Sequence, residues 1–170
     1  METKQIADGR GMFSLLFCDQ ELVSLLGDRI IIQMNYSLKS QEGSVRGLHY
    51  QYPPHKKMKL VRCLKGSVWD VAVDLRDGSP TFLNWHAEML PEGNSRMMVI
   101  PEGCAHGFQV LDEDSELLYL HTAAYAPDSE CGIRYDAPLI SEAWPLAIAD
   151  VSNSDQQLQL LRSDFKGMKL

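Results

Sequence analysis

Long apolar runs are missing from this 170-residue sequence. No stretch approaches the ~20 apolar residues that a membrane-spanning helix needs. The amino-terminal segment METKQIADGRGMF also contains no apolar run of signal-peptide length. We therefore expect a soluble, cytoplasmic protein that does not bind a membrane.

Basic residues are in the minority. Sixteen lysines and arginines stand against 23 acidic residues, which gives a net charge of −7. This balance argues against broad contact with nucleic-acid phosphates or anionic lipid. A small anionic ligand remains compatible with the composition if a few cations converge locally.

Cysteine is also sparse. Cys18, Cys63, Cys104 and Cys131 are scattered, with no CxxC pair and no dense framework. Such usage is typical of reduced thiols in the cytosol, and small buried residues are the simplest interpretation of all four.

Helical periodicity is weak along most of the chain. Short runs rich in Val, Ile, Leu and Tyr alternate with turn residues instead, which indicates β-structure. Strand candidates cover residues 29–37, 44–51, 59–76, 85–90, 96–103, 105–112 and 116–125, and the run 59–76 reads as two strands joined at a Lys65-Gly66 turn. Only residues 19–27 and 154–164 suggest helices. We expect a single domain over 1–170 with an all-β, cupin-like double-sheet jelly roll and short helices at both margins.

One motif raises the question of a metal. The segment PEGCAH, ending at His106, fits the P-x-G-x-x-H pattern of the second cupin motif. The first cupin motif needs two histidines one residue apart and a nearby glutamate, but Gln51 follows His49 at that spacing and the acidic ligand is missing. A divalent ion usually takes three or four protein ligands, so we expect no bound metal.

Without a metal, the polar groups near His49 would carry any chemistry. Lys59 lies ten residues beyond His49, and Tyr119 and Tyr125 come from a late strand and the turn after it. A histidine, a lysine and a tyrosine in one pocket would provide a base, an oxyanion partner and an acid. Each also has a plainer interpretation alone, as a core histidine, a packed strand tyrosine or a solvated lysine.

Several blocks in order carry a family resemblance. They are DGRGMF (8–13), QMNYS (33–37), RGLHYQ (46–51), KLVRCLKGSVWDVAVDLRDGSPTF (59–82), IPEGCAHGFQVL (100–111), YAP (125–127) and WPL (144–146). Over almost its full length the sequence resembles the dTDP-4-dehydrorhamnose 3,5-epimerase family. The resemblance implies a metal-free and cofactor-free jelly roll that forms a homodimer through its sheets. It also implies a nucleotide-linked 4-keto-6-deoxyhexose as substrate.

The resemblance further assigns catalytic roles. His49 would remove the proton, and Asp155 would pair with His49. Lys59 would steady the enolate oxygen, and Tyr119 would return a proton from the opposite face. A ketone at C4 acidifies the protons on C3 and C5 only when the enolate oxygen meets positive charge or hydrogen-bond donors, so these residue types suit the reaction.

Substrate binding is implied for a second group. Arg46 would hold the diphosphate together with Arg10, which the family contributes across the dimer interface, and an arginine fork suits phosphate oxygens. The resemblance places the remaining members around the sugar and nucleotide: Gln33, Asn35, Gln51, Tyr125, Trp144 and His106. We expect Asp70 to hydrogen-bond within the same barrel. Ordinary sheet packing or turn bonding is the alternative for Gln33, Asn35, Tyr125 and Trp144.

Three positions depart from the family pattern. Leu15 replaces a glutamate associated with the nucleotide end, Ile6 stands where an aromatic residue is common, and Ser154 replaces a lysine beside Asp155. The identity of the nucleotide therefore stays open. Inversion at C3 alone, or action on another nucleotide-linked 4-keto sugar, is an alternative within the same chemistry. A metal-dependent cupin enzyme and a non-catalytic sugar-binding cupin are more distant alternatives.

Overall fold

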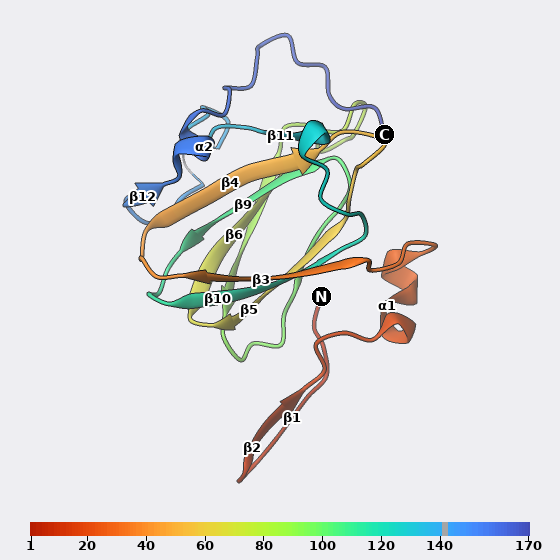
Figure 1. The fold of residues 1–170 in the computed structure, drawn as a ribbon, viewed down its shortest axis with the longest axis vertical. Coiled ribbons are helices and arrows are strands. Elements are labelled where there is room, and N and C mark those ends of the chain that lie inside the picture. Colours follow the sequence, from red (N-terminus) through yellow and green to blue (C-terminus); the bar gives the residue numbers. More distant parts are fainter. Residues whose placement is uncertain (141–142) are drawn as a thin grey trace.

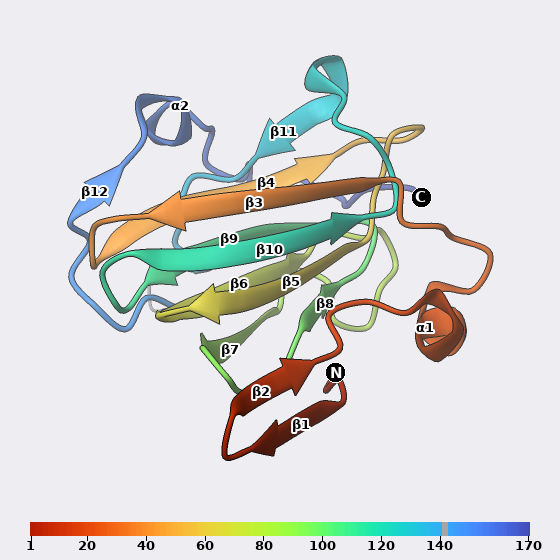
Figure 2. The ribbon, with the colours of Figure 1, turned by 60° about the horizontal axis from the view of Figure 1, so that its bottom comes forward.

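Two facing β-sheets form the body of the molecule in the computed structural model, which describes residues 1–140 and 143–170 (Figures 1 and 2). The smaller sheet has the order β3 (Gln33–Lys39), β10 (Ser115–His121), β5 (Lys59–Lys65) and β8 (Met98–Ile100). The larger sheet has the order β11 (Glu130–Gly132), β4 (Ser44–Gln51), β9 (Cys104–Val110), β6 (Ser67–Asp74) and β7 (Trp85–Pro91), with β12 (Asp150–Val151) beside β4. The predicted double-sheet jelly roll is confirmed.

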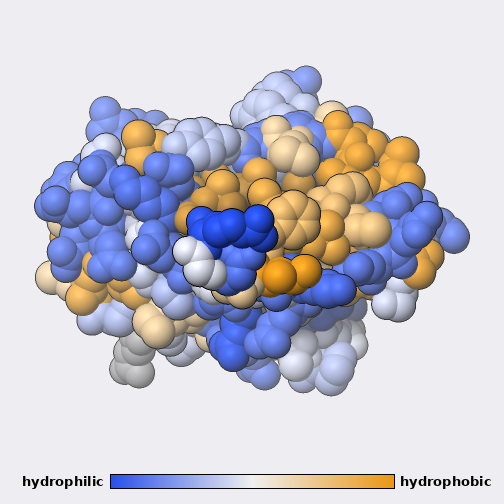
Figure 3. Space-filling model, turned by 90° about the horizontal axis from the view of Figure 1, so that it is seen from below, coloured by the Kyte–Doolittle hydropathy of each residue, from blue (hydrophilic) through white to orange (hydrophobic). Residues whose placement is uncertain are grey.

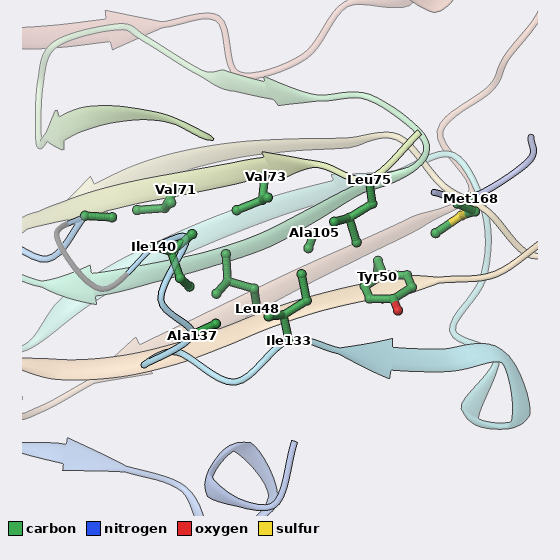
Figure 4. Close-up of a cluster of buried hydrophobic side chains, with 11 residues drawn as sticks. Leu48, Tyr50, Val71, Val73, Leu75, Ala105, Ile133, Ala137, Ile140 and Met168 are labelled. Carbon is green, nitrogen blue, oxygen red and sulfur yellow. The ribbon is translucent and has the colours of Figure 1, made fainter. Parts of the chain in front are cut away.

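The larger sheet is covered on both faces over β4, β9 and β6, whereas its edge strand β7 is mostly exposed. Between the sheets, Val61 and Leu117 pack against Val68 and Phe108 in one apolar cluster. On the other face, sheet residues such as Leu48 meet the later chain at Ile133, Ala137 and Ile140 (Figure 4). The inner cluster holds the two sheets together, and the outer one fixes the carboxyl-terminal part of the chain onto β4 and β6.

The turn at Gly66 carries the chain from one sheet to the other. Strands β5 and β6 therefore do not pair with each other, although their sequence resembles a hairpin. Gly66 has a φ of +74°, and a Cβ there would lie 2.5 Å from the Ser115 hydroxyl. Strand β5 is buried on both faces from Lys59 to Cys63, because helix α1 (Asp19–Leu26) covers its outer face through Leu22 and Leu26.

The amino terminus forms a hairpin that the sequence did not suggest. Strands β1 (Gln5–Asp8) and β2 (Gly11–Ser14) pair antiparallel and project from the body of the molecule (Figure 1). Strand β3 begins at Gln33 and not at residue 29 as expected. The hairpin gives the molecule an arm with few contacts to its own core.

The prediction of a helix over 154–164 is wrong beyond its first turn. Helix α2 spans only Asn153–Gln156, and a short 3₁₀ helix, η1 (Pro127–Ser129), precedes β11. The chain leaves the helix because Gln159 forms an isolated parallel bridge with Ile133, and its carbonyl accepts a bond from the Arg134 amide. No helix among the described residues is long and apolar enough to cross a membrane.

Candidate active site

A pocket of about 1070 Å³ opens between the two sheets. The smaller sheet contributes side chains from β3, β5 and β10, while the larger sheet contributes β4 and β9, and residues 150–158 close one side. Most of the residues singled out by the sequence line this pocket: Gln33, Asn35, Arg46, His49, Gln51, Lys59, His106, Tyr119, Tyr125 and Asp155. Residues up to 122 positions apart in the chain therefore meet in one place.

His49 forms a close pair with Asp155. The His49 Nε2 atom lies 2.7 Å from the Asp155 Oδ1 atom, and the second carboxylate oxygen accepts the Gly47 amide at 3.1 Å. Burial would raise the pKa of Asp155, but the bonds from His49 and Gly47 outweigh it and lower that pKa. Ser152 caps α2 by accepting the Asp155 amide at 3.1 Å, which fixes the carboxylate in place.

An irregularity in β4 orients Arg46 and His49 into the same pocket. Residues three apart on a regular strand point to opposite faces. The register between β4 and β9 shifts between Arg46 and His49, so both side chains line the pocket. Gly47 makes this possible, because its φ is +107° and a Cβ would lie 2.7 Å from the His106 carbonyl oxygen.

Lys59 is buried at the start of β5. Its Nζ atom donates to the His49 carbonyl oxygen at 3.0 Å. Burial and the neighbouring charge of Lys57 lower the pKa of Lys59 to about 7, against weaker attraction from Asp70 and Glu130. This amine therefore changes charge near neutral pH beside the backbone of His49.

Tyr119 lies across the pocket on the other sheet. It sits in the middle of β10, whereas His49 belongs to β4, so the two side chains enter from opposite walls. Burial and the charge of Asp70 raise the pKa of Tyr119 above its usual value, which keeps the phenol protonated at neutral pH. Its ring stacks on His121, with centroids 6.1 Å apart.

A second histidine–aspartate pair lies beneath the first. His106 is opposite His49 in the β4–β9 register, and its Nε2 atom lies 2.6 Å from the Asp70 Oδ1 atom. Both side chains are buried, and burial lowers the pKa of His106 despite the attraction of Asp70. Asp70 was expected to hydrogen-bond within the barrel, and its partner there is His106.

Gln51 is bonded on all sides by the protein itself. Its side-chain amide donates to the carbonyl oxygens of His55 at 2.7 Å and Ala124 at 3.2 Å. Its oxygen accepts from Lys57 at 2.9 Å and from the Ala126 amide at 3.1 Å. Gln51 thus fastens the loop after β10 to β4, although it also lines the pocket.

Gln33, Asn35 and Tyr125 form a connected polar edge of the pocket. Gln33 donates to the Asn35 side chain at 2.9 Å and accepts the Tyr125 amide at 2.8 Å. The Tyr125 hydroxyl donates to Glu130 at 2.7 Å. The polar groups that the sequence suggested here are positioned by one another.

Two predicted residues lie elsewhere. Trp144 does not line the pocket: its indole nitrogen donates to the Tyr135 carbonyl oxygen at 2.9 Å and its ring packs on the outer apolar cluster. Arg10 sits at the tip of the β1–β2 hairpin, where it pairs with Asp8 at 2.7 Å. Trp144 fits the packing alternative, and Arg10 lies on the projecting hairpin, outside the pocket of its own chain.

The pocket residues that the sequence did not single out include Lys39, Lys57, Glu130 and His121. Lys39 lies near Arg46, and burial together with that like charge lowers the pKa of Lys39. Lys57 stands over the Tyr125 ring, with its nitrogen 5.7 Å from the centroid. None of the four belongs to a recognisable motif, so only the folded arrangement reveals them.

Among the described residues, no three histidine, cysteine, aspartate or glutamate side chains gather in the way that a metal site requires. The two histidines of the cupin-type motifs each bond to a single aspartate instead. The donor set is thus arranged as two hydrogen-bonded pairs.

Comparison with known proteins gives consistent matches. A family model described as dTDP-4-dehydrorhamnose 3,5-epimerase matches residues 1–163. An enzyme of that name from Sinorhizobium fredii is 40% identical over 171 residues, covering 98% of this chain and 88% of its own. The crystal structure of the Bacillus anthracis enzyme with TDP and PPi bound matches with a TM-score of 0.90 at 32% identity, covering 94% of this chain and 91% of that chain. A Legionella pneumophila dTDP-6-deoxy-D-glucose-3,5-epimerase in complex with dTDP-4-keto-L-rhamnose matches with a TM-score of 0.89 at 39% identity, covering 98% and 90%.

Proposed function

The chain belongs to the dTDP-4-dehydrorhamnose 3,5-epimerase family, and on that premise we propose that its pocket inverts C3, C5 or both in a nucleoside-diphosphate-4-keto-6-deoxyhexose. The observation that carries this proposal is the pairing of His49 with Asp155 on one wall of the pocket and the protonated Tyr119 on the other. Inversion needs proton removal on one face of a sugar ring and proton return on the opposite face. Because His49 and Tyr119 enter from opposite walls of the pocket, they can act on opposite faces of a sugar ring bound between them.

His49 is the proposed base. Asp155 holds one ring nitrogen and stabilises the imidazolium that forms when the other nitrogen takes the proton. The C–H electrons then form a carbon–carbon double bond, and the carbonyl electrons move onto the C4 oxygen. Tyr119 returns a proton from the other wall as the carbonyl reforms, and solvent exchange restores both side chains.

Lys59 is the proposed partner of the enolate oxygen, and its pKa predicts a pH dependence. The ammonium stabilises the enolate, whereas the neutral amine does so less. With a pKa of about 7, Lys59 loses its proton as the pH rises. We therefore expect kcat/KM to fall about tenfold per pH unit above this value, since kcat/KM reports the free enzyme.

Lys59→Arg tests whether Lys59 causes this fall in kcat/KM at alkaline pH, the alkaline limb of the pH profile. A guanidinium stays protonated throughout the pH range. The limb should move to higher pH in this variant, whatever its absolute rate. Lys65→Arg, at the exposed end of the same strand, serves as the control and should keep the original profile. An unchanged limb in Lys59→Arg would exclude Lys59 as its source.

Arg46 and Lys39 are the proposed ligands of the diphosphate within one subunit. Both line the pocket, and they lie close enough for Arg46 to lower the pKa of Lys39. Two neighbouring cations at one wall favour a multiply charged anion. With the diphosphate bound to these cations, the attached sugar can lie between the base His49 and the acid Tyr119.

A homodimer is the proposed assembly. Strand β3 is an edge strand of its sheet, and its outward side chains Met34, Tyr36 and Leu38 are 60%, 58% and 49% exposed. Apolar side chains gather on the side of the molecule from which the hairpin projects (Figure 3). An unpaired edge with a contiguous apolar stripe favours pairing with a second chain.

The β1–β2 hairpin is the proposed arm between subunits. Its side chains Ile6, Met12 and Phe13 are 55%, 56% and 72% exposed, which is unfavourable in water and favourable against a partner. Arg10 at the tip would then reach the partner's diphosphate. Arg10→Ala is expected to lower kcat/KM about tenfold through the lost charged hydrogen bonds.

A mixed dimer tests whether Arg10 acts across the interface. Arg10→Ala and His49→Ala subunits with different tags are co-expressed and the heterodimer is purified through both tags. One of its two sites contains an intact His49 and receives Arg10 from the other subunit, so we expect about half of the wild-type activity. Activity no higher than that of the two parents would place Arg10 in its own subunit or outside the site.

We also propose that residues 1–170 form one domain and that the enzyme works in the cytoplasm. Cys18, Cys63, Cys104 and Cys131 are all free, which suits a reducing compartment.

Turnover is the direct test of the proposed function. The protein is incubated with dTDP-4-keto-6-deoxyglucose and the sugar is followed by NMR. Inversion at C3 and C5 supports the double epimerisation, and inversion at C3 alone supports the narrower activity. No inversion of this sugar or of its counterparts on other nucleotides would refute the proposal.

A further inference from the structure

His121 is a buried side chain in the pocket for which neither the family motifs nor the proposed proton transfers provide a role. It is the last residue of β10, it lines the pocket, and it is only 6% exposed. Neither of its ring nitrogens has a hydrogen-bond partner within the described residues. Buried polar atoms are nearly always paired, so two unpaired nitrogens on a residue that lines a cavity point to a ligand that pairs them.

The neighbours of His121 locate it within the pocket. It follows Tyr119 by two positions and so shares its face of β10, and the two rings stack. Because β10 lies between β3 and β5, His121 is opposite Gln33 on one side and Lys59 on the other. His121 is thus next to the group proposed to hold the ketone oxygen.

The charge of His121 limits what it can bind. Burial, with Lys57, Lys59 and His106 nearby, lowers the pKa of His121 to about 3. The ring is therefore neutral near pH 7, with one nitrogen that donates a hydrogen bond and one that accepts. A hydroxyl group, which also donates and accepts, matches this ring better than a phosphate or a carboxylate, which only accept.

We propose, resting on the proposed function, that His121 binds the C3 hydroxyl of the keto sugar and selects for sugars that have it. Side chains opposite each other on adjacent strands lie about 5 Å apart, which suits oxygens on adjacent carbons of one ring. If Lys59 holds the C4 oxygen, the neighbouring carbons are C3, which has a hydroxyl, and C5, which has a methyl group. C3 is therefore the only neighbour with a partner for His121.

The test compares two substrates in heavy water. One is dTDP-4-keto-6-deoxyglucose, and the other is the same compound without the C3 hydroxyl. Deuterium entry is followed by NMR for the wild type and for His121→Phe, which removes both nitrogens and keeps a ring to stack on Tyr119. His121→Gln, which keeps a donor and an acceptor, is the rescue variant, and His86→Phe, at an exposed position on β7, is the matched control.

Wild type is expected to prefer the 3-hydroxy sugar about tenfold in kcat/KM, the effect of one neutral hydrogen bond. His121→Phe should lose this preference by slowing on the 3-hydroxy sugar alone, while His121→Gln retains part of it and His86→Phe all of it. Equal slowing on both sugars, or no slowing, would overturn the proposal, and His121→Leu provides the same comparison if the Phe variant does not fold. Absence of exchange in the wild type would overturn the proposed function itself, and this inference with it.

Discussion

Replacement of His49 by alanine is expected to slow deuterium entry at C3 and C5 by about 10³- to 10⁴-fold, the full contribution of a positioned general base. The His49 ring is held by a buried carboxylate at 2.7 Å and its side chain is 26% exposed in the pocket, whereas the side chain of His106, which is held in the same way, is only 5% exposed. Alanine leaves no group at this position to take the proton. Single-turnover exchange in heavy water, followed by NMR, measures the effect.

Two control measurements test whether the slower exchange in His49→Ala comes from loss of the base alone. His86→Ala removes an exposed histidine from β7 and should leave the exchange rate unchanged. The His49→Ala variant should still bind dTDP, because the proposed diphosphate ligands are intact. Exchange within tenfold of the wild-type rate in His49→Ala would assign the base to another residue.

Tyr119→Phe is expected to separate proton exchange from inversion. Net formation of the inverted sugar should fall by about 10²- to 10³-fold, within the range for loss of a general acid. Proton removal by His49 from the other wall should persist, so that deuterium enters with retention of configuration faster than inverted product forms. The ratio of retained to inverted deuterated sugar, measured by NMR, reports the effect.

The phenylalanine ring keeps the volume of Tyr119 and its stacking on His121, so the fold should be preserved. Tyr135→Phe is the matched control, since Tyr135 lies outside the pocket lining. Equal loss of exchange and inversion in Tyr119→Phe would contradict its role as the acid on the opposite face.

Strand positions could be predicted because they depend on local patterns, and the family resemblance supplied most of the proposed site residues. The apolar patterns predict the bounds of β4 and β6 to within about two residues. The motif RGLHYQ identifies Arg46 and Gln51 as neighbours of His49 in the pocket. Asp155 was matched from its place near the carboxyl terminus, and the structure brings it to His49. Predicting these features needs only the amino-acid sequence and its resemblance to a known family.

Features that depend on tertiary context could not be predicted. The register shift at Gly47 reflects the close approach of β9, which no local pattern encodes. Residues 157–164 were expected to extend a helix, but pairing with Ile133 gives their backbone other partners. Trp144 looked like a pocket residue because its motif matched, whereas its ring fills an apolar cluster. His121 has no motif, and its unpaired nitrogens are visible only once the sheets face each other.

The proposed proton transfers next to the sugar ketone need only the side chains of the chain itself. The most direct test is to incubate the purified protein, after metal chelation, with dTDP-4-keto-6-deoxyglucose in heavy water and to locate deuterium by NMR. We expect deuterium at C3, at C5 or at both, at a rate that chelation does not change. Absence of deuterium from this and every other nucleotide-linked 4-keto sugar, or exchange that disappears with a stoichiometric metal, would contradict this expectation.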